Sequence, residues 1–219
     1  ILGIKRPNYI SKNYFSKRIY NYNKKIKIII TIRDPYKRFV SHYFHLASFG
    51  LVPFFNLKKN FYKLVKKDKK FLKENPRANE ILASQYYWEN YINLRKYLPK
   101  KNILILDIKD IQNVSTQKKL DKFLGLKLNY NFIKENVGSY DYFSIFLKML
   151  IYKIVLKKDE NHRLHKRKIN YFQKVIVFSL YILLKLNFFK KKIKIDQKLK
   201  IKIYSMFNNS YKKIYSLKI

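Results

Sequence analysis

The chain has 219 residues and is 47% hydrophobic, which predicts one sizeable core and a single domain over residues 1–219. It contains no cysteine and only four histidines, which excludes disulfides and thiolate metal sites, argues against a zinc site and indicates a cytoplasmic location. A net charge of +37 favours anionic partners. Most of the 50 basic residues are lysine, however, so the charge alone does not identify a partner.

Two apolar segments predict buried strands. Residues 26–32 contain three consecutive isoleucines, and residues 102–108, NILILDI, are also apolar, with no polar alternation in either. Strands buried on both faces are typical of parallel sheets. Apolar residues at helical spacing, such as Phe39, Tyr43 and Phe44, lie between the two segments. We therefore expect a right-handed strand–helix–strand crossover in an α/β fold.

The rest of the sequence predicts mainly helices. Ser115 is placed to cap a short helix that Gly125 ends. Apolar residues then recur at helical spacing over residues 143–156, 169–189 and 197–217. We expect a helical carboxyl-terminal part of the domain.

The segment VIVFSLYILLKL, residues 175–186, is almost wholly apolar. As a helix it extends roughly 18 Å, less than the roughly 30 Å hydrocarbon core of a bilayer, so it should not span a membrane. Two alternatives stay open. The favoured one is a helix buried in the core or in a lid, within a helical insertion at residues 140–190. The other is a helix that lies on an anionic membrane surface.

The stretch IIITIRDPYKRFVSHYFH, residues 28–45, joins the first predicted strand to a helix. Asp34 suits the N-cap position and Pro35 the first helical position, so the helix should begin directly after Arg33. Open α/β folds bind ligands at the carboxyl edge of the sheet, where this joint lies. A guanidinium presents a planar fork to a phosphate, so Arg33 indicates a phosphate site.

Three polar residues follow on the predicted helix. Arg38, Ser41 and His45 recur at helical spacing, opposite the apolar residues. The Ser41 hydroxyl adds a directional donor, so Arg33 and Ser41 together suit a phosphate monoester. On spacing alone, an ordinary helix start with solvated or ion-paired arginines remains the alternative.

The stretch IKIIITIRDPYKRFVSHYFH, residues 26–45, resembles the 3′-phosphate-binding segment of sulfotransferases that use 3′-phosphoadenosine 5′-phosphosulfate (PAPS). Four further segments, in order, resemble the carbohydrate and heparan-sulfate branch of this family. They are GIKRPNYI at residues 3–10, QYYWENYINLRKYLPKKNILILDIKDI at 85–111, STQKKLDKFLGL at 115–126 and IDQKLKIKIYSMFNNSYKKIYSL at 195–217. The resemblance covers nearly the whole chain.

The resemblance implies a P-loop-NTPase-like three-layer α/β fold with a central parallel sheet. It implies that Arg33 and Ser41 hold the 3′-phosphate of PAPS. It also implies that Lys5 is the catalytic residue beside the sulfonate, where its ammonium stabilises the charge of the transition state. Arg38 and Tyr43 are expected to support the site rather than bind the ligand.

The remaining candidate residues are less specific. In NVGSYDYFS, the residues Asn136, Gly138 and Ser139 match a loop that the family uses near the adenosine and the 3′-phosphate, and an ordinary loop is the alternative. His45 is a candidate for binding the acceptor, and exposure on the helix is its alternative.

The sequence departs from the family in two places. No K-x-G-T-T/S loop, which would cradle the 5′-phosphosulfate, is present, and Ile4 stands where the family has a glutamate before the lysine. We therefore expect an amino-terminally truncated chain that lacks the first P-loop strand–helix unit. By itself such a chain would bind PAPS weakly and would not turn it over.

These observations predict a PAPS-dependent sulfotransferase that transfers a sulfonate group to a hydroxyl or amine of a carbohydrate or glycolipid. We expect no metal, no specific nucleic acid and at most peripheral contact with an anionic membrane. The alternative is a basic protein that binds nucleic acids or other polyanions without catalysis.

Overall fold

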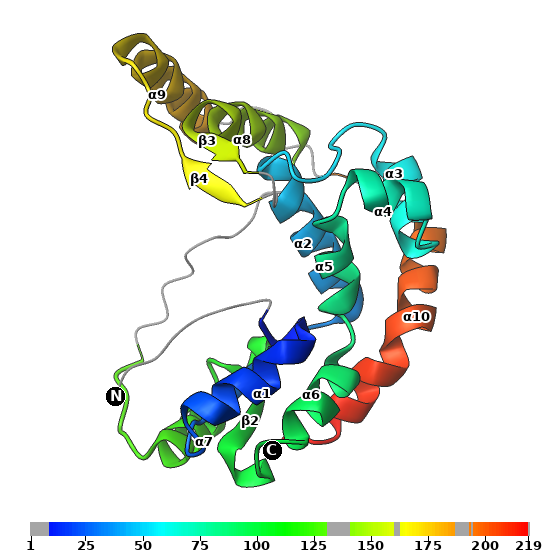
Figure 1. Cartoon of the computed structure of the whole chain (residues 1–219), viewed down its shortest axis with the longest axis vertical. Coiled ribbons are helices and arrows are strands. Elements are labelled where there is room, and N and C mark those ends of the chain that lie inside the picture. Colours follow the sequence, from blue (N-terminus) through cyan, green and yellow to red (C-terminus); the bar gives the residue numbers. More distant parts are fainter. Residues whose placement is uncertain (1–8, 131–140, 160–162, 187–192, 194, 219) are drawn as a thin grey trace. The chain divides into compact units, whose positions relative to one another are not determined.

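The computed structural model describes residues 9–130, 141–159, 163–186, 193 and 195–218, and helices make up most of them (Figure 1). The chain divides into two compact units, each assembled from segments far apart in the sequence. The first unit takes Ile1–Arg38, Ala83–Glu135 and Ile203–Ile219, and the second takes Phe39–Leu82 and Asn136–Lys202. The two long helices α2 (Pro35–Ser48) and α10 (Gln197–Tyr215) each contribute residues to both units.

The first unit is a mixed α/β structure. Besides parts of α2 and α10 it contains η1 (Tyr9–Ser11), α1 (Asn13–Tyr22), β1 (Ile28–Ile32), α6 (Tyr87–Arg95), η2 (Lys100–Asn102), β2 (Ile103–Asp107), η3 (Ile108–Asp110) and α7 (Val114–Leu124). The second unit contains α3 (Leu57–Val65), α4 (Lys69–Glu74), α5 (Ala78–Ala83), α8 (Tyr142–Val155), β3 (Leu156–Lys158), β4 (Leu164–Lys166) and α9 (Tyr171–Leu186).

The two predicted strands pair in parallel, in a register that runs from Ile28 opposite Ile103 to Ile32 opposite Asp107. All five residues of β2 are buried, as predicted. In β1 the expectation of two buried faces is wrong, because Ile29 and Thr31 are exposed. The described residues cover only one face of β1.

The covered face of the sheet forms the core of the first unit. Ile30 and Ile32 of β1 and Ile103 and Ile105 of β2 pack in one cluster with buried residues of α6, its carboxyl-terminal extension and α10. Those residues are Tyr87, Tyr91, Leu94, Leu98 and Ile214. The four from the α6 region recur at i, i+4, i+7 and i+11, so one stripe of this helix faces the sheet.

The start of α7 differs from the prediction. Ser115 was expected to cap this helix, but the helix begins at Val114 and Asn113 occupies the N-cap position. Val114 is 65% exposed, so no burial requirement prevents the helix from beginning before Ser115. Gly125 ends the helix with a positive φ of 74°, as predicted, in a conformation that favours glycine.

The core of the second unit contains the apolar face of α2. The rings of Phe39, Tyr43 and Phe44 surround Phe61 of α3, with centroid distances of 5.8, 4.4 and 6.0 Å. The Tyr43 hydroxyl donates a 2.6 Å hydrogen bond to the Pro53 carbonyl, and burial raises the pKa of Tyr43. These contacts agree with a supporting role for Tyr43.

The segment 175–186 forms α9, and the expectation of burial in the core is wrong. No residue of α9 is buried, and Tyr171 and Phe178 are 82% and 67% exposed. The helix packs on α8 only along one side. Periodicity identified the helix correctly, but it carries no information about what covers an apolar face.

Within the part of the chain that the structure describes, none of the helices combines the length and the apolar character needed to cross a bilayer.

The α10 helix provides a stability test. Phe207 of α10 is fully buried, and its ring meets Tyr86 edge-on at 5.1 Å. We expect Phe207→Ala to lower the free energy of unfolding by about 3–5 kcal/mol, because a large buried side chain is lost. Ile201 lies on the same helix and is 63% exposed, so Ile201→Ala should change stability by no more than about 0.5 kcal/mol. Denaturant unfolding measures both values, and similar losses for the two variants would contradict this packing.

Candidate functional site

The joint between β1 and α2 has the geometry that the sequence predicts. The strand ends at Ile32 and the helix begins at Pro35. Asp34 Oδ1 accepts a 2.9 Å hydrogen bond from the backbone N–H of Lys37, which makes Asp34 the N-cap. One backbone N–H group of the first turn of α2 therefore has its hydrogen-bond acceptor within the chain.

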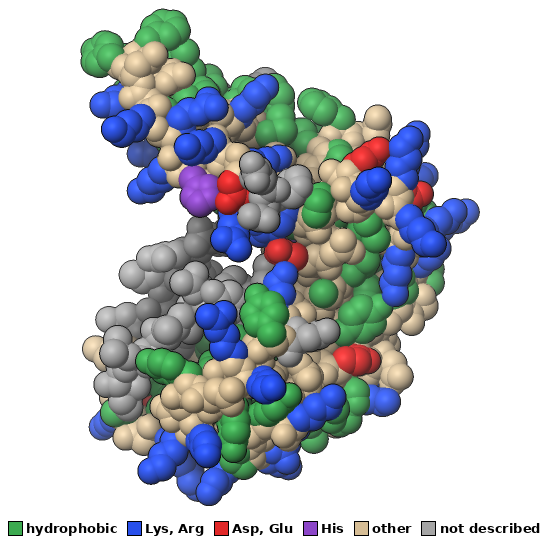
Figure 2. All heavy atoms as spheres, viewed as in Figure 1, with side chains coloured by type: hydrophobic (Ala, Val, Ile, Leu, Met, Phe, Trp, Pro, Cys, Tyr) green, Lys and Arg blue, Asp and Glu red, His purple; other side chains and the backbone are tan. Residues whose placement is uncertain are grey.

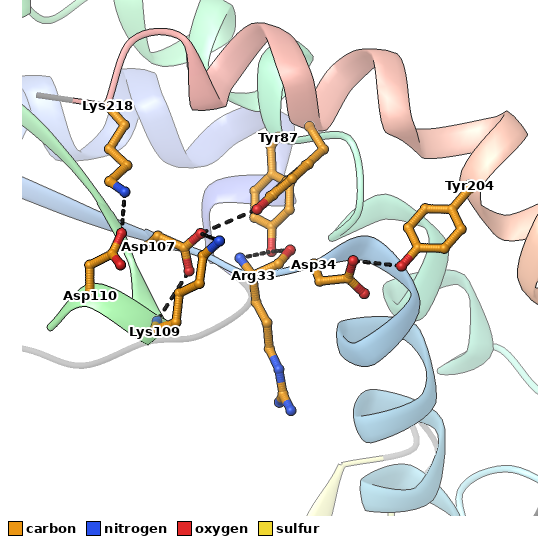
Figure 3. A network of polar contacts seen from close by, with 9 residues as sticks. Arg33, Asp34, Tyr87, Asp107, Lys109, Asp110, Tyr204 and Lys218 are labelled. Atoms are coloured by element: carbon orange, nitrogen blue, oxygen red, sulfur yellow. Dashed lines mark hydrogen bonds and ion pairs between the residues drawn. The ribbon is translucent and has the colours of Figure 1, made fainter.

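The Tyr87 hydroxyl holds this joint from α6 (Figure 3). It accepts a hydrogen bond from the backbone N–H of Arg33 at 3.1 Å and donates to the Arg33 carbonyl at 3.3 Å. It also accepts from Arg38 Nη1 at 2.7 Å, and the Arg38 guanidinium lies 4.7 Å from the centre of the Tyr87 ring. Arg38 is thus committed to Tyr87, in agreement with a supporting role.

The second carboxylate oxygen of Asp34 is also occupied. Oδ2 accepts a 2.7 Å hydrogen bond from the Tyr204 hydroxyl of α10. Burial, this bond and the negative charge of Asp34 raise the pKa of Tyr204 to about 12. Asp34 therefore joins two segments of the first unit that are 170 residues apart in the sequence.

The end of β2 carries a second acidic group, Asp107, which is 2% exposed. Its Oδ1 accepts from the Lys109 backbone N–H at 3.1 Å, and its Oδ2 accepts from the Tyr211 hydroxyl at 3.2 Å and lies 3.5 Å from Lys109 Nζ. The carboxylate raises the pKa of Lys109, and Lys218 pairs with Asp110 beside it. Sequence reasoning missed Asp107, although an acidic residue at the end of an apolar strand was a usable signal.

Arg33 differs from these neighbours. Its side chain is half-buried and extends away from Asp34 and Asp107 (Figure 3). Among the described residues, its guanidinium has no hydrogen bond and no ion pair. Since a guanidinium has five N–H donors in a fixed planar arrangement, Arg33 can bind an anion at the carboxyl edge of the sheet without breaking an existing contact.

Ser41 and His45 lie further along α2, in the part that belongs to the second unit. Ser41 is half-buried, whereas His45 is exposed on the helix, with its ring edge-on to Phe49 at 4.9 Å. Burial and the positive charges of Lys148 and Arg77 lower the pKa of His45, so its imidazole is neutral at pH 7. Because Arg33 belongs to the first unit, its convergence with Ser41 on one phosphate stays a prediction.

The other predicted site residues, Lys5, Asn136, Gly138 and Ser139, lie outside the described residues. In the ranges that the structure does describe, no group of His, Asp or Glu side chains is arranged to hold a metal ion. A cavity of about 1070 Å³ is present in the second unit, beside α3 and the start of α10. Its lining includes Tyr62, Tyr142 and Asp196, and it does not include Arg33, Ser41 or His45.

The Asp34–Tyr204 bond can be tested by titration. Asp34→Asn keeps an oxygen acceptor but removes the negative charge, so the pKa of Tyr204 should fall from about 12 towards the ordinary value of about 10. NMR titration of ring-labelled tyrosine, assigned with Tyr204→Phe, measures this pKa. The folded protein holds the phenol proton more tightly than the unfolded chain does. The bond therefore contributes stability up to about pH 10 and loses it as the pH rises towards 12.

Asp110→Asn is the matched control for this titration, because it removes a carboxylate that pairs with Lys218 rather than with a tyrosine of the joint. It should leave the Tyr204 pKa unchanged. An unchanged Tyr204 pKa in Asp34→Asn would show that the carboxylate is not the cause of the shift.

A comparison of the chain with protein-family models and with curated protein sequences finds no match. The residues at the sheet edge and the sequence resemblance to PAPS-dependent sulfotransferases are therefore the features that bear on function.

Proposed function

We propose that the chain is part of a PAPS-dependent sulfotransferase that acts on a carbohydrate or glycolipid acceptor, and that Arg33 binds the 3′-phosphate of the nucleotide. One observation carries the proposal. At the carboxyl edge of the sheet, the half-buried Arg33 guanidinium has no hydrogen bond or ion pair with a described residue, whereas Arg38 and Lys109 are committed to Tyr87 and Asp107.

The local charge balance supports binding of an anion at this edge. Two carboxylates of this edge, Asp34 and Asp107, each accept two or more donors from within the chain, and neither forms an ion pair with Arg33. A half-buried guanidinium gains more from an anion than a fully solvated lysine does, because fewer water molecules compete for its donors. A bidentate contact with a phosphate is worth roughly 1.5–3 kcal/mol.

The proposed reaction transfers the sulfonate in one in-line step. The oxygen of an acceptor hydroxyl forms a bond to sulfur while the bond from sulfur to the bridging phosphate oxygen breaks. The hydroxyl proton passes to water, and adenosine 3′,5′-bisphosphate leaves. Lys5 stabilises the negative charge on the bridging oxygen, and Ser41 and the loop residues Asn136, Gly138 and Ser139 bind the nucleotide, as the resemblance implies. His45, which is neutral at pH 7, is proposed to contact the acceptor.

The 3′-phosphate itself makes the proposal testable. Adenosine 3′,5′-bisphosphate should bind more tightly than adenosine 5′-monophosphate, which lacks the 3′-phosphate. Arg33→Ala should weaken binding of the bisphosphate by about 10 to 100-fold and leave the monophosphate little changed, so that the preference disappears. Ligand-observed NMR titration measures both affinities even when binding is weak.

Lys37→Ala is the matched control, because it removes one positive charge from the same joint at an exposed position. It should preserve the preference for the bisphosphate. Equal affinity of the wild-type protein for the two nucleotides, or a preference that survives Arg33→Ala, would overturn the proposal.

The alternative of a basic polyanion-binding protein rests on the net charge of +37. It predicts binding to heparin and DNA that falls steeply with salt and does not depend on Arg33. The enzyme proposal predicts that retention on immobilised adenosine 3′,5′-bisphosphate decreases less with rising salt than retention on heparin does. It also predicts that Arg33→Ala abolishes retention on the bisphosphate and leaves retention on heparin unchanged. Equal salt sensitivity on both matrices, unchanged by that substitution, would favour the alternative.

A further inference from the structure

Helix α9 presents an apolar stripe to solvent. Tyr171, Val175, Phe178, Ile182 and Leu186 follow one another at spacings of four, three, four and four residues, which places them on one side of the helix. Their exposed fractions are 82%, 45%, 67%, 41% and 53%. Isolated exposed apolar residues are ordinary on protein surfaces, but a continuous stripe along a whole helix is not.

The opposite side of α9 is the one that packs within the second unit. Gln173, Ile176, Val177, Leu180 and Leu184 are all half-buried, and α8 is the helix that α9 contacts most. The packing face and the exposed stripe are therefore different sides of one helix. The exposed stripe is therefore not the side by which α9 contacts α8, and Phe172, Tyr181 and Leu183 add further exposed apolar surface to the helix.

Basic side chains surround the stripe. In Figure 2, green apolar and blue basic side chains lie next to one another over α9 and the β3–β4 hairpin, at the top left. The exposed basic residues described in this region are Lys157, Lys158, Arg163, Lys166, Arg167, Lys168, Lys174 and Lys185. Asp159 is the single acidic residue described between positions 156 and 186, and it pairs with His165 at 2.9 Å.

The two lysines of α9 occupy one flank of the stripe. Lys174 precedes Phe178 by four residues and Lys185 follows Ile182 by three, so both lie on the same side of the apolar row. A lysine at such a position can bury its methylene groups and keep its ammonium at the level of lipid phosphates. The helix is about 24 Å long, long enough for a stable contact in the plane of a membrane surface.

We propose that α9 lies in the interface of an anionic lipid bilayer, with its apolar stripe at the boundary between headgroups and acyl chains. The flanking lysines and the basic β3–β4 hairpin contact the lipid phosphates. The occupant is a lipid surface rather than a second copy of the chain. Two copies joined through α9 would bring two strongly basic regions together, whereas anionic lipids neutralise both the helix and the hairpin.

Binding to vesicles tests this proposal. The full chain is sedimented with vesicles of phosphatidylcholine and phosphatidylglycerol, and with vesicles of phosphatidylcholine alone. We expect strong binding to the anionic vesicles, and a loss of about tenfold or more in Phe178→Glu, because a charge replaces the centre of the apolar stripe. Lys174→Gln and Lys185→Gln should each weaken binding by about fivefold and reduce its dependence on salt.

Ile201→Glu is the control for the glutamate variant. It adds the same charge at an exposed apolar position of another helix, α10, and should bind the vesicles like the wild-type protein. Circular dichroism establishes that each variant is folded. Equal binding of the wild-type protein and Phe178→Glu would overturn the proposal, because the attraction would then be electrostatic only.

A second variant reports the position of α9 directly. In Phe178→Trp, the new indole should shift its emission to shorter wavelength on anionic vesicles and be quenched by brominated lipids more strongly than Trp88 of the wild-type protein. Emission that stays solvent-like on bound vesicles would contradict insertion of the stripe. Sedimentation equilibrium tests whether a second copy of the chain covers the stripe instead. If the wild-type protein does not bind vesicles but forms concentration-dependent dimers that Phe178→Glu abolishes, the stripe is a dimer contact and the proposal is overturned.

Discussion

The hydroxyl of Tyr87 is the contact on which the rest of the proposed site depends. It binds both backbone polar groups of Arg33 and the guanidinium of Arg38, so it fixes the angle at which β1 passes into α2. A buried hydroxyl must be satisfied, and here it is satisfied three times by one short segment. The backbone of Arg33 is held in place by this contact while its side chain is left out of it. A rigid backbone that carries a cation without a partner among the described residues is an arrangement suited to binding a ligand.

The scarcity of acidic residues explains why no described carboxylate pairs with the Arg33 guanidinium. The chain has 13 Asp and Glu residues for 50 Lys and Arg residues. At the edge of the sheet, the acids Asp34, Asp107 and Asp110 are used to connect helices and strands of the first unit rather than to neutralise Arg33. A solvated lysine of this strongly basic chain needs no carboxylate partner, because water stabilises its charge. A half-buried arginine has lost part of that water, so the excess of positive charge matters most there.

Local signals in the sequence predicted much of this structure. The apolar runs located β1 and β2, Asp34 and Pro35 located the start of α2, and Gly125 located the end of α7, since each depends on neighbouring residues only. The contacts around the site could not be predicted in this way: Tyr87 is 54 residues from Arg33, and Tyr204 is 170 residues from Asp34. No local pattern states which tyrosine meets which carboxylate. The apolar composition of α9 predicted a helix, but the favoured expectation of burial in the core was wrong, because apolar composition alone does not state what covers a helix.

The small sheet has a consequence of its own. Within the described residues, β1 and β2 pair only with each other, so each strand has a hydrogen-bonded neighbour on one side. Both are edge strands, and every edge strand leaves a row of backbone N–H and C=O groups that water, a helix or a further strand must satisfy. Two-stranded parallel pairs are uncommon in isolation because parallel sheets are usually wide and covered. The exposed residues Ile29 and Thr31 add an open face to these edges, so within the described residues β1 is covered on one face only.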